Sequence, residues 1–236
     1  MEITSYRYAI IVAAFNEADN IATCLQRIFA VFPNDAEVIV VDGGSDDTGR
    51  IVAETQPHFP QLRYIHNEND RGKGHAIRVG MHASRAPVTG QLDADLQFFP
   101  EDLRRLFQVI ENNTADVALG SRFHPEVRHL LKDDGIFRHM GNIVVSRVAS
   151  ALFAHQMTDV LAGIKAWNTE KMNALGIRYD SFSYEVEIPV RALKSRLRVM
   201  DVPVRTVPRP GGTSKVRVIR DGTRILLDTA LMKLHN

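Results

Sequence analysis

The chain lacks several features that mark whole classes of protein. Cys24 is its one cysteine, so it cannot form an internal disulfide, which fits a reducing compartment. No stretch approaches the about 18 to 20 consecutive apolar residues that a membrane-spanning helix needs, and the start has no basic region followed by an apolar run, as a secretory signal would. We therefore expect a cytoplasmic protein, for which a peripheral contact with the cytoplasmic face of a membrane stays open.

The net charge is small, but the charges are unevenly distributed. Of the 236 residues, 44% are hydrophobic and 24% are charged, which indicates a globular protein and, most simply, a single domain spanning residues 1–236. The net charge of +1 hides a basic segment, residues 191–224, whose acidic residues are only Asp201 and Asp221. This segment favours an anionic partner. We expect no nucleic acid among the partners, and the sequence predicts no oligomeric state.

Strand-like and helix-like patterns alternate along the first half of the chain. Apolar runs of strand length are each followed by a polar turn and a helical pattern, which is typical of βαβ units. We predict an α/β fold with one Rossmann-like, open, twisted and mostly parallel sheet flanked by helices, whose ligands bind beyond the carboxyl ends of the strands. The predicted strands are 8–14, 37–41, 62–66, one ending near 92, 116–119 and 198–204, and the predicted helices include one from about 16 or 17, 100–110 and about 137–154.

Two carboxylates one residue apart stand at the expected end of an apolar strand. Because strand side chains alternate between faces, Asp93, Asp95 and Gln97 are expected on the same side, where their oxygens suit a hard cation such as Mg2+ or Mn2+. Such a cation would bridge the phosphates of a nucleoside diphosphate and neutralise the charge of that leaving group. A pair of solvated turn acids is the structural alternative.

Two common nucleotide-binding motifs are missing. A dinucleotide dehydrogenase has Gly-x-Gly-x-x-Gly after its first strand, but residues 13–17 read Ala-Ala-Phe-Asn-Glu, and the later Gly72-Lys73-Gly74 lacks a third glycine. The Gly-x4-Gly-Lys-Ser/Thr cradle of P-loop enzymes is also missing. These absences favour a site in which separate turns hold the nucleotide and a metal holds the diphosphate.

Several motifs in a specific order carry a family resemblance. The chain resembles the family-two inverting glycosyltransferases of the GT-A fold, in particular the branch of dolichyl-phosphate or polyprenyl-phosphate mannosyl- and glucosyltransferases. It departs from that pattern at Ala13, where the family usually has Pro, at Gly43, where it has a second Asp, and at Ala162 and Ile164, where it has Ser and Phe. The segments that carry the resemblance are 12–17, 40–48, 71–74, 93–97, 120–122, 158–163, 202–204 and 209–215.

The resemblance implies a nucleotide-sugar donor site in residues 1–120. Asp42 would accept hydrogen bonds from the base, although an Asp before two glycines is also a common turn former. Asp95 and Gln97 would be direct metal ligands, and Asp93 would position the sugar or the metal. Lys73, between two glycines at a helix start, suits a diphosphate, with a solvated lysine as the alternative. The remaining donor-site residues would be Ala13, Ala14, Phe15, Glu17 and Ala94.

The resemblance implies acceptor binding by residues 121–215. Arg122 and Arg138 lie where the family binds the acceptor phosphate, and Arg209 and Lys215 match its final basic motif. Arginine suits phosphate because its planar donors reach two oxygens at once. A lipid monophosphate has a second pKa of about 6, so it is a nucleophile at neutral pH without a general base. A hydroxyl acceptor would need a base, and Asp159 is then the best candidate, although a structural or helix-capping role is an equal alternative.

Three questions stay open at this point. The donor is GDP-mannose or a UDP-sugar, and the acceptor is a polyprenyl or dolichyl phosphate or a hydroxyl of a small molecule or glycan. A nucleotide-sugar-binding protein without catalysis is an alternative of another class. The tail, residues 216–236, is predicted to be helical and amphipathic, and we favour packing on the domain over contact with a membrane.

Overall fold

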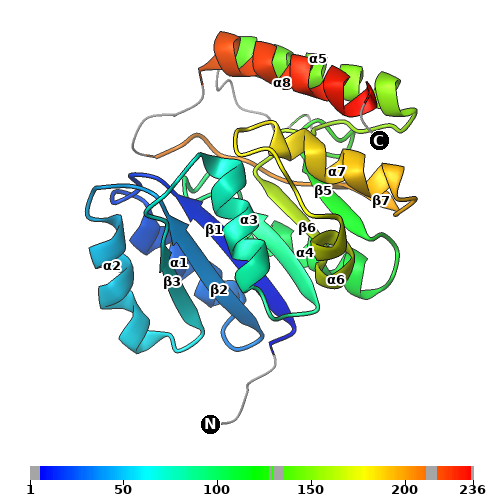
Figure 1. Ribbon diagram of the computed structural model, residues 1–236. Coiled ribbons are helices and arrows are strands. Elements are labelled where there is room, and N and C mark those ends of the chain that lie inside the picture. The colour runs from blue at the N-terminus through cyan, green and yellow to red at the C-terminus, as the bar shows by residue number, and fades with distance from the viewer. Residues whose placement is uncertain (1–5, 128, 130–135, 211–216, 235–236) are drawn as a thin grey trace.

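The computed structural model describes residues 6–127, 129, 136–210 and 217–234, and these form one open sheet flanked by helices (Figure 1). The strand order is β3-β2-β1-β4-β6-β5-β7. The predicted α/β class with a mostly parallel sheet is confirmed. The strands are β1 (Tyr8–Ala14), β2 (Ala36–Asp42), β3 (Leu62–His66), β4 (Val88–Leu92), β5 (Val117–Ser121), β6 (Ile164–Asn168) and β7 (Val199–Pro203).

One strand breaks the parallel arrangement. β6 runs antiparallel to both of its neighbours, β4 and β5, whereas β1, β2, β3 and β4 pair in parallel, as do β5 and β7. Our sequence prediction missed β6, because its second residue is a lysine, Lys165, and a short run that contains a charge does not resemble a buried strand. The register places Gln91 of β4 opposite Lys165, next to the carboxyl end of β4.

Helices cover both faces of the sheet. In β1, Ile10 and Val12 pack into one apolar layer with α1 and α4, and Ile11 packs into the other with α3 and α7, as the alternation of strand side chains requires. The helices are α1 (Ile21–Val31), α2 (Thr48–Thr55), α3 (Lys73–Ala83), α4 (Pro100–Glu111), α5 (Ile136–Phe153), α6 (Thr169–Leu175), α7 (Tyr184–Lys194) and α8 (Val218–Leu234), with a short 3-10 turn at Gln56–His58.

The first helix begins later than predicted. α1 starts at Ile21, not near residue 16 or 17, because Asn16 has a left-handed φ of 55° that ends β1 in a turn. The Asn16 side chain accepts a hydrogen bond from the Ser45 backbone N–H at 2.9 Å. Asparagine tolerates this conformation better than most residues. The polar turn after β1 is thereby tied to the turn after β2.

α5 and α8 form a separate layer above the sheet. They lie side by side in Figure 1, and α8 also packs against α7. Ile225 and Met232 of α8 are buried, so this helix packs on its own domain, as we favoured from the sequence. No helix in the described part of the chain is long and apolar enough to cross a membrane.

Candidate active site

A cavity of about 610 Å³ lies between the carboxyl end of the sheet and the helix pair α5 and α8. It brings together most of the site residues predicted from the sequence, although these come from distant segments. The predicted residues that line it are Ala13, Ala14, Phe15, Glu17, Lys73, Asp93, Ala94, Asp95, Gln97, Arg122 and Arg209.

Two predicted residues, Asp42 and Asp159, are not among the described residues that line it, and two others are not described well enough to be placed. Asp42 and Asp159 are buried beside the cavity. Arg138 belongs to α5, but its side chain lies outside the described residues, as does the whole of Lys215. Their predicted contacts with an acceptor phosphate therefore stay predictions.

Asp42 holds the turn that follows β2. Its carboxylate accepts hydrogen bonds from the Gly44 N–H at 2.8 Å and from the Tyr64 hydroxyl at 3.1 Å. Burial first, and then the Asp42 carboxylate, raise the pKa of Tyr64 to about 12. In this arrangement Asp42 shapes the turn, and its predicted contact with a nucleotide base stays a prediction.

The acidic triplet lies in a turn and not on a strand. β4 ends at Leu92, and Leu96 adopts a left-handed φ of 63°, so strand alternation is not what aligns the three side chains. The Asp95 carboxylate accepts the backbone N–H of Gln97 at 3.2 Å, which closes the turn. Asp93, Asp95 and Gln97 nevertheless all line the same cavity. The three side chains therefore lie on the same side, as predicted, but a tight turn and not strand alternation brings them together.

Two basic side chains sit against the acidic turn. Lys73 Nζ lies 2.6 Å from Asp93 Oδ1, and Arg209 contacts both Glu17 at 2.6 Å and Asp95 at 3.7 Å. Burial, with help from Asp95 and Glu185, raises the pKa of Asp93 to about 6, and Lys73 opposes that rise. The cavity wall therefore carries acids and bases in close pairs.

Arg122 is held in place by Asp159. Arg122 Nε and Nη2 donate to the two Asp159 oxygens at 2.7 and 2.9 Å, and the Arg122 backbone N–H adds a third bond at 3.1 Å. Burial lowers the pKa of Arg122, but Asp159 outweighs this effect and raises it. Asp159 is fully buried, and a general base must reach the proton that it removes. This geometry favours a structural role for Asp159.

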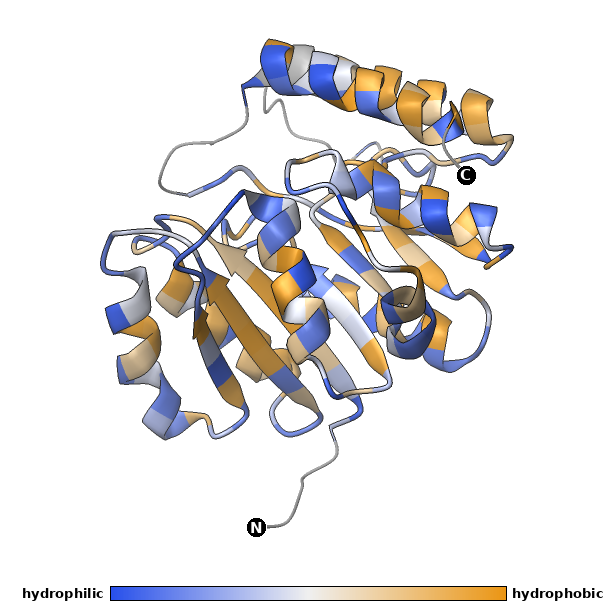
Figure 2. Ribbon diagram, in the orientation of Figure 1, coloured by the Kyte–Doolittle hydropathy of each residue, from blue (hydrophilic) through white to orange (hydrophobic). Residues whose placement is uncertain are grey.

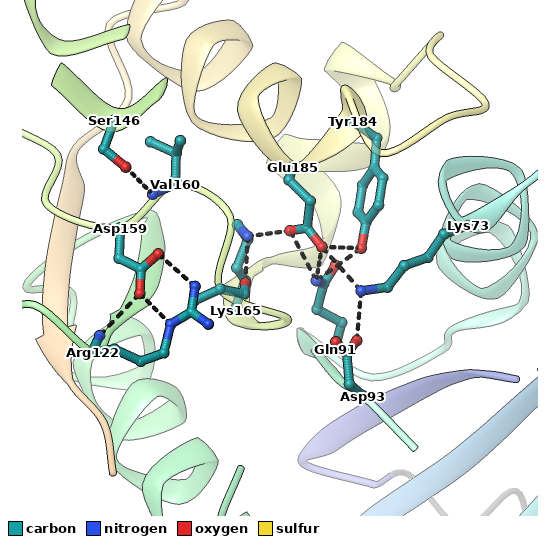
Figure 3. Close-up of polar contacts among 11 residues, drawn as sticks. Lys73, Gln91, Asp93, Arg122, Ser146, Asp159, Val160, Lys165, Tyr184 and Glu185 are labelled. Atoms are coloured by element: carbon teal, nitrogen blue, oxygen red, sulfur yellow. Dashed lines mark hydrogen bonds and ion pairs between the residues drawn. The ribbon is translucent and has the colours of Figure 1, made fainter. Parts of the chain in front are cut away.

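Sequence reasoning missed Glu185, a carboxylate at the start of α7. Figure 3 shows it between two lysines, Lys165 and Lys73, beside Tyr184 and Gln91. One signal was present, because a lysine inside an otherwise apolar run, such as Lys165, needs a buried acidic partner. The sequence does not say which acid, since Glu185 lies 20 residues further along the chain.

The residues at the acidic turn suit a divalent cation that shares its ligands with a phosphate. No group of three or more His, Cys, Asp or Glu side chains that could hold a metal occurs among the residues the structure describes. Mg2+ is commonly bound by one or two carboxylates together with substrate phosphates, and not by a cage of protein ligands. Asp95 and Gln97, side by side in the cavity, provide such a partial set.

The sequence profile of the family described as glycosyl transferase family 2 matches residues 9–142, which is more than half of the chain. The chain belongs to this family. Its fold and its cavity thus belong to a glycosyltransferase, and the family implies binding of a nucleotide-sugar donor.

Individual relatives are more distant. The chain is 28% identical over 230 residues to glycosyltransferase AglD of Haloferax volcanii, covering 92% of this chain and 36% of that protein. It is 26% identical over 223 residues to the polyprenol monophosphomannose synthase of Mycolicibacterium smegmatis, covering 89% of this chain and 81% of that protein. Among solved structures, glucosyl-3-phosphoglycerate synthase from Mycobacterium tuberculosis superposes with a TM-score of 0.73 at 17% identity, covering 97% of this chain and 79% of that one. This last similarity concerns the fold alone.

Proposed function

We propose that this glycosyltransferase moves a hexose from a nucleotide-sugar, GDP-mannose or a UDP-sugar, to a polyprenyl or dolichyl phosphate with inversion at the anomeric carbon. One observation carries the proposal: the same cavity has a charged floor and an apolar roof. The floor includes Lys73, Asp93, Asp95 and Arg122. The roof is formed by α5 and α8 and includes Val144, Val145, Ile219, Ile225 and Leu226.

The charged floor suits the donor. Asp95 and Gln97 would hold Mg2+ or Mn2+, and such an ion stabilises the departing nucleoside diphosphate when it is bound. Lys73 would contact the diphosphate, and Asp93 would orient the sugar. The structural neighbour from Mycobacterium tuberculosis was solved with Mn2+ and UDP-glucose, which supports a metal-dependent donor site. Glu17 and the turn at 13–15 would flank the nucleoside.

The roof suits a lipid acceptor better than a sugar hydroxyl. A nucleotide-sugar has no long apolar part to bury against Val145, Ile225 and Leu226, whereas a polyprenyl chain does. Arg122 lies in the same cavity and suits the phosphate of such a lipid. A lipid phosphate attacks without a general base, which agrees with the buried position of Asp159. The protein then has to align the two substrates and stabilise charge.

We also propose a peripheral membrane contact through the exposed face of α8, with the whole chain acting as one cytoplasmic domain. The first half of that face carries Arg220 and Arg224, and the second half carries Leu227, Leu231 and Leu234. Figure 2 shows the same division, with hydrophilic residues at one end of the α5 and α8 pair and hydrophobic residues at the other. Basic residues attract anionic lipids, and leucines enter the interface.

Donor and acceptor can be tested in one series of assays. A thermal-shift panel of GDP, UDP and their sugars with Mn2+ should raise the melting temperature for one base, because a bound ligand stabilises the folded state. With that donor, we expect sugar transfer to a polyprenyl phosphate and none to the matching polyprenol, which lacks the phosphate. Transfer to the polyprenol, or nucleotide binding without any release of nucleoside diphosphate, would contradict the proposal.

The membrane contact has its own test. Wild-type protein should float with vesicles that contain anionic lipid and lose that binding as salt is raised. Replacing both Arg220 and Arg224 by Gln should weaken the affinity for these vesicles by roughly 30-fold, at about 1 kcal/mol for each basic residue near the surface. Equal flotation of both proteins would remove the membrane role from this face of α8.

A further inference from the structure

Lys73 stands between two carboxylates that come from different parts of the chain. Its ammonium lies 2.6 Å from Asp93 Oδ1 and 3.1 Å from Glu185 Oε1 (Figure 3). Asp93 follows β4 and lines the cavity, whereas Glu185 belongs to α7 and is almost completely buried. One cation is thus shared between the acidic turn and a carboxylate fixed in the core.

Behind Glu185 lies a second lysine. Lys165 of β6 is fully buried, and its ammonium contacts Glu185 Oε2 and the Ala162 carbonyl oxygen. Lys165, Glu185, Lys73 and Asp93 therefore form a chain of alternating charges that runs from the core to the cavity. The pKa of Glu185 is lowered because Lys165, followed by Lys73, outweighs the effect of burial.

Glu185 is fixed more firmly than an ion pair alone would fix it. Besides the two lysines, its carboxylate accepts the Tyr184 hydroxyl at 2.5 Å and lies 3.3 Å from Gln91 Nε2. A buried ion pair adds little net stability compared with apolar residues of the same size, because both charges lose their hydration. The contact with Lys73 is the one that connects this buried group to the cavity.

We propose that Glu185 is a positioning residue that holds the Lys73 ammonium at the cavity wall, ready for the diphosphate of the donor. The inference rests on the function proposed above. A lysine side chain is flexible, and ordering it at the moment of binding costs conformational entropy. Because the contact with Glu185 already orders the Lys73 side chain before the donor binds, this entropy is not lost during binding. The same contact also prevents the ammonium from pairing with Asp93 alone.

The variant Glu185→Gln keeps the shape of the side chain but removes its charge. We expect its Kd for the nucleoside diphosphate with Mn2+, and its KM for the donor, to rise by roughly ten-fold or more, as expected when a charge-assisted hydrogen bond is lost. The effect on kcat should be smaller. Glu185→Asp keeps the charge and should recover part of the affinity.

A double-mutant cycle separates positioning from a purely structural role. If Glu185 acts through Lys73, then adding Glu185→Gln to Lys73→Met should change nucleotide affinity by less than about two-fold, because the two changes remove one interaction. An equal loss of affinity in both backgrounds would overturn the proposal, since it would show that Glu185 acts independently of Lys73.

A matched control lies two residues away on the same helix. Glu187 is also buried, but it binds the backbone N–H groups of Arg178 and Tyr179 and the side chain of Arg191. Glu187→Gln should lower the melting temperature and leave nucleotide affinity unchanged. A loss of affinity equal to that of Glu185→Gln would count against a specific role for Glu185.

One further variant, and the use of nucleotide affinity as the measured quantity, keep the test decisive. If Glu185→Gln fails to fold, the pair Lys165→Met and Glu185→Gln removes both buried charges and is measured in the same cycle. Because the cycle reads nucleotide affinity, it does not depend on the acceptor. Failure of transfer to polyprenyl phosphate would thus contradict the proposed function, whereas additivity in the cycle would contradict only the role of Glu185.

Discussion

The two walls of the cavity recognise their ligands in different ways. The floor consists of charged side chains held in fixed pairs, such as Lys73 with Asp93 and Arg122 with Asp159. The roof presents apolar side chains, of which Val144 is 48% and Ile219 is 86% exposed, so that the mouth of the cavity is open and apolar. Charge recognition depends on exact positions, whereas apolar recognition depends on area. Substitutions should therefore be costly in the floor and mild in the roof.

The largest effect is expected at the acidic turn. Asp95→Ala removes the carboxylate that we assign to the metal, and we expect the sugar-transfer rate to fall at least about 100-fold, together with loss of Mn2+-dependent nucleotide affinity. The melting temperature without ligand should change little, since the Asp95 carboxylate accepts one backbone hydrogen bond from Gln97 at 3.2 Å and lies at the long distance of 3.7 Å from Arg209. Transfer and metal-dependent affinity that both survive this change would contradict the metal site.

Two glycines that line the cavity compare the walls directly. A Cβ at Gly163 in the floor would lie 1.9 Å from Asp93 Oδ2, whereas a Cβ at Gly222 in α8 meets nothing within 4 Å. We expect Gly163→Ala to displace Asp93 and lower transfer by about ten-fold or more. Gly222→Ala should keep activity and raise stability by roughly 0.5 to 1 kcal/mol, because alanine favours a helix. Similar activities for both variants would remove the distinction between floor and roof.

Lowering the pH should weaken ligand binding by the charged floor and leave binding by the apolar roof unchanged. The pKa of Asp93 is raised to about 6, so this carboxylate is charged at pH 7 and becomes protonated as the pH falls through about 6. Because Asp93 is proposed to orient the sugar, affinity for the nucleotide-sugar donor with Mn2+ should fall over the same range. In Lys73→Met the midpoint should move to higher pH, because Lys73 lowers this pKa. Titration calorimetry between pH 5 and 8 provides the measurement. An affinity that does not change over this range would contradict a contribution of the Asp93 carboxylate to binding.

The raised pKa of Asp93 also makes the stability of the fold depend on pH. Because the pKa of Asp93 is about 6 in the folded protein and 3.8 in the reference state, the folded state binds the proton more tightly in that window. The contribution of Asp93 to stability is therefore greatest at low pH and declines as the pH rises from about 4 to 6. Asp93→Asn should remove this component from the pH dependence of the free energy of unfolding.

The smallest effect is expected in the roof. Replacing Val144 and Ile219 by Ser reduces apolar area at the mouth, and we expect a few-fold rise in KM for a long-chain polyprenyl phosphate. The KM for a short, water-soluble prenyl phosphate and the affinity for the donor should not change. Met200→Ser, at an exposed methionine of β7 that does not line the cavity, is the matched control. An equal rise in KM for both lipids would exclude a contact with the prenyl chain.

Local sequence determined most of the framework and the composition of the floor. The run Tyr8–Ala14 is apolar and short, and it is a strand with the bounds predicted. The acidic turn and Lys73 were identified because each lies within a few residues of a strand end or a helix start, where the chemistry of turns is local. The resemblance that these motifs carried is confirmed by the family match over residues 9–142.

Only the tertiary structure decided which charges meet. Glu185 meets Lys165 and Lys73 across 20 and 112 residues of chain, and Arg122 meets Asp159 across 37. Such pairs form because burial forces each charge to find a partner, and the sequence contains many candidates for each. The roof is also a tertiary feature, since α8 reaches the cavity only by packing on α5 and α7. The sequence therefore determined which groups are available, and packing determined where each of them acts.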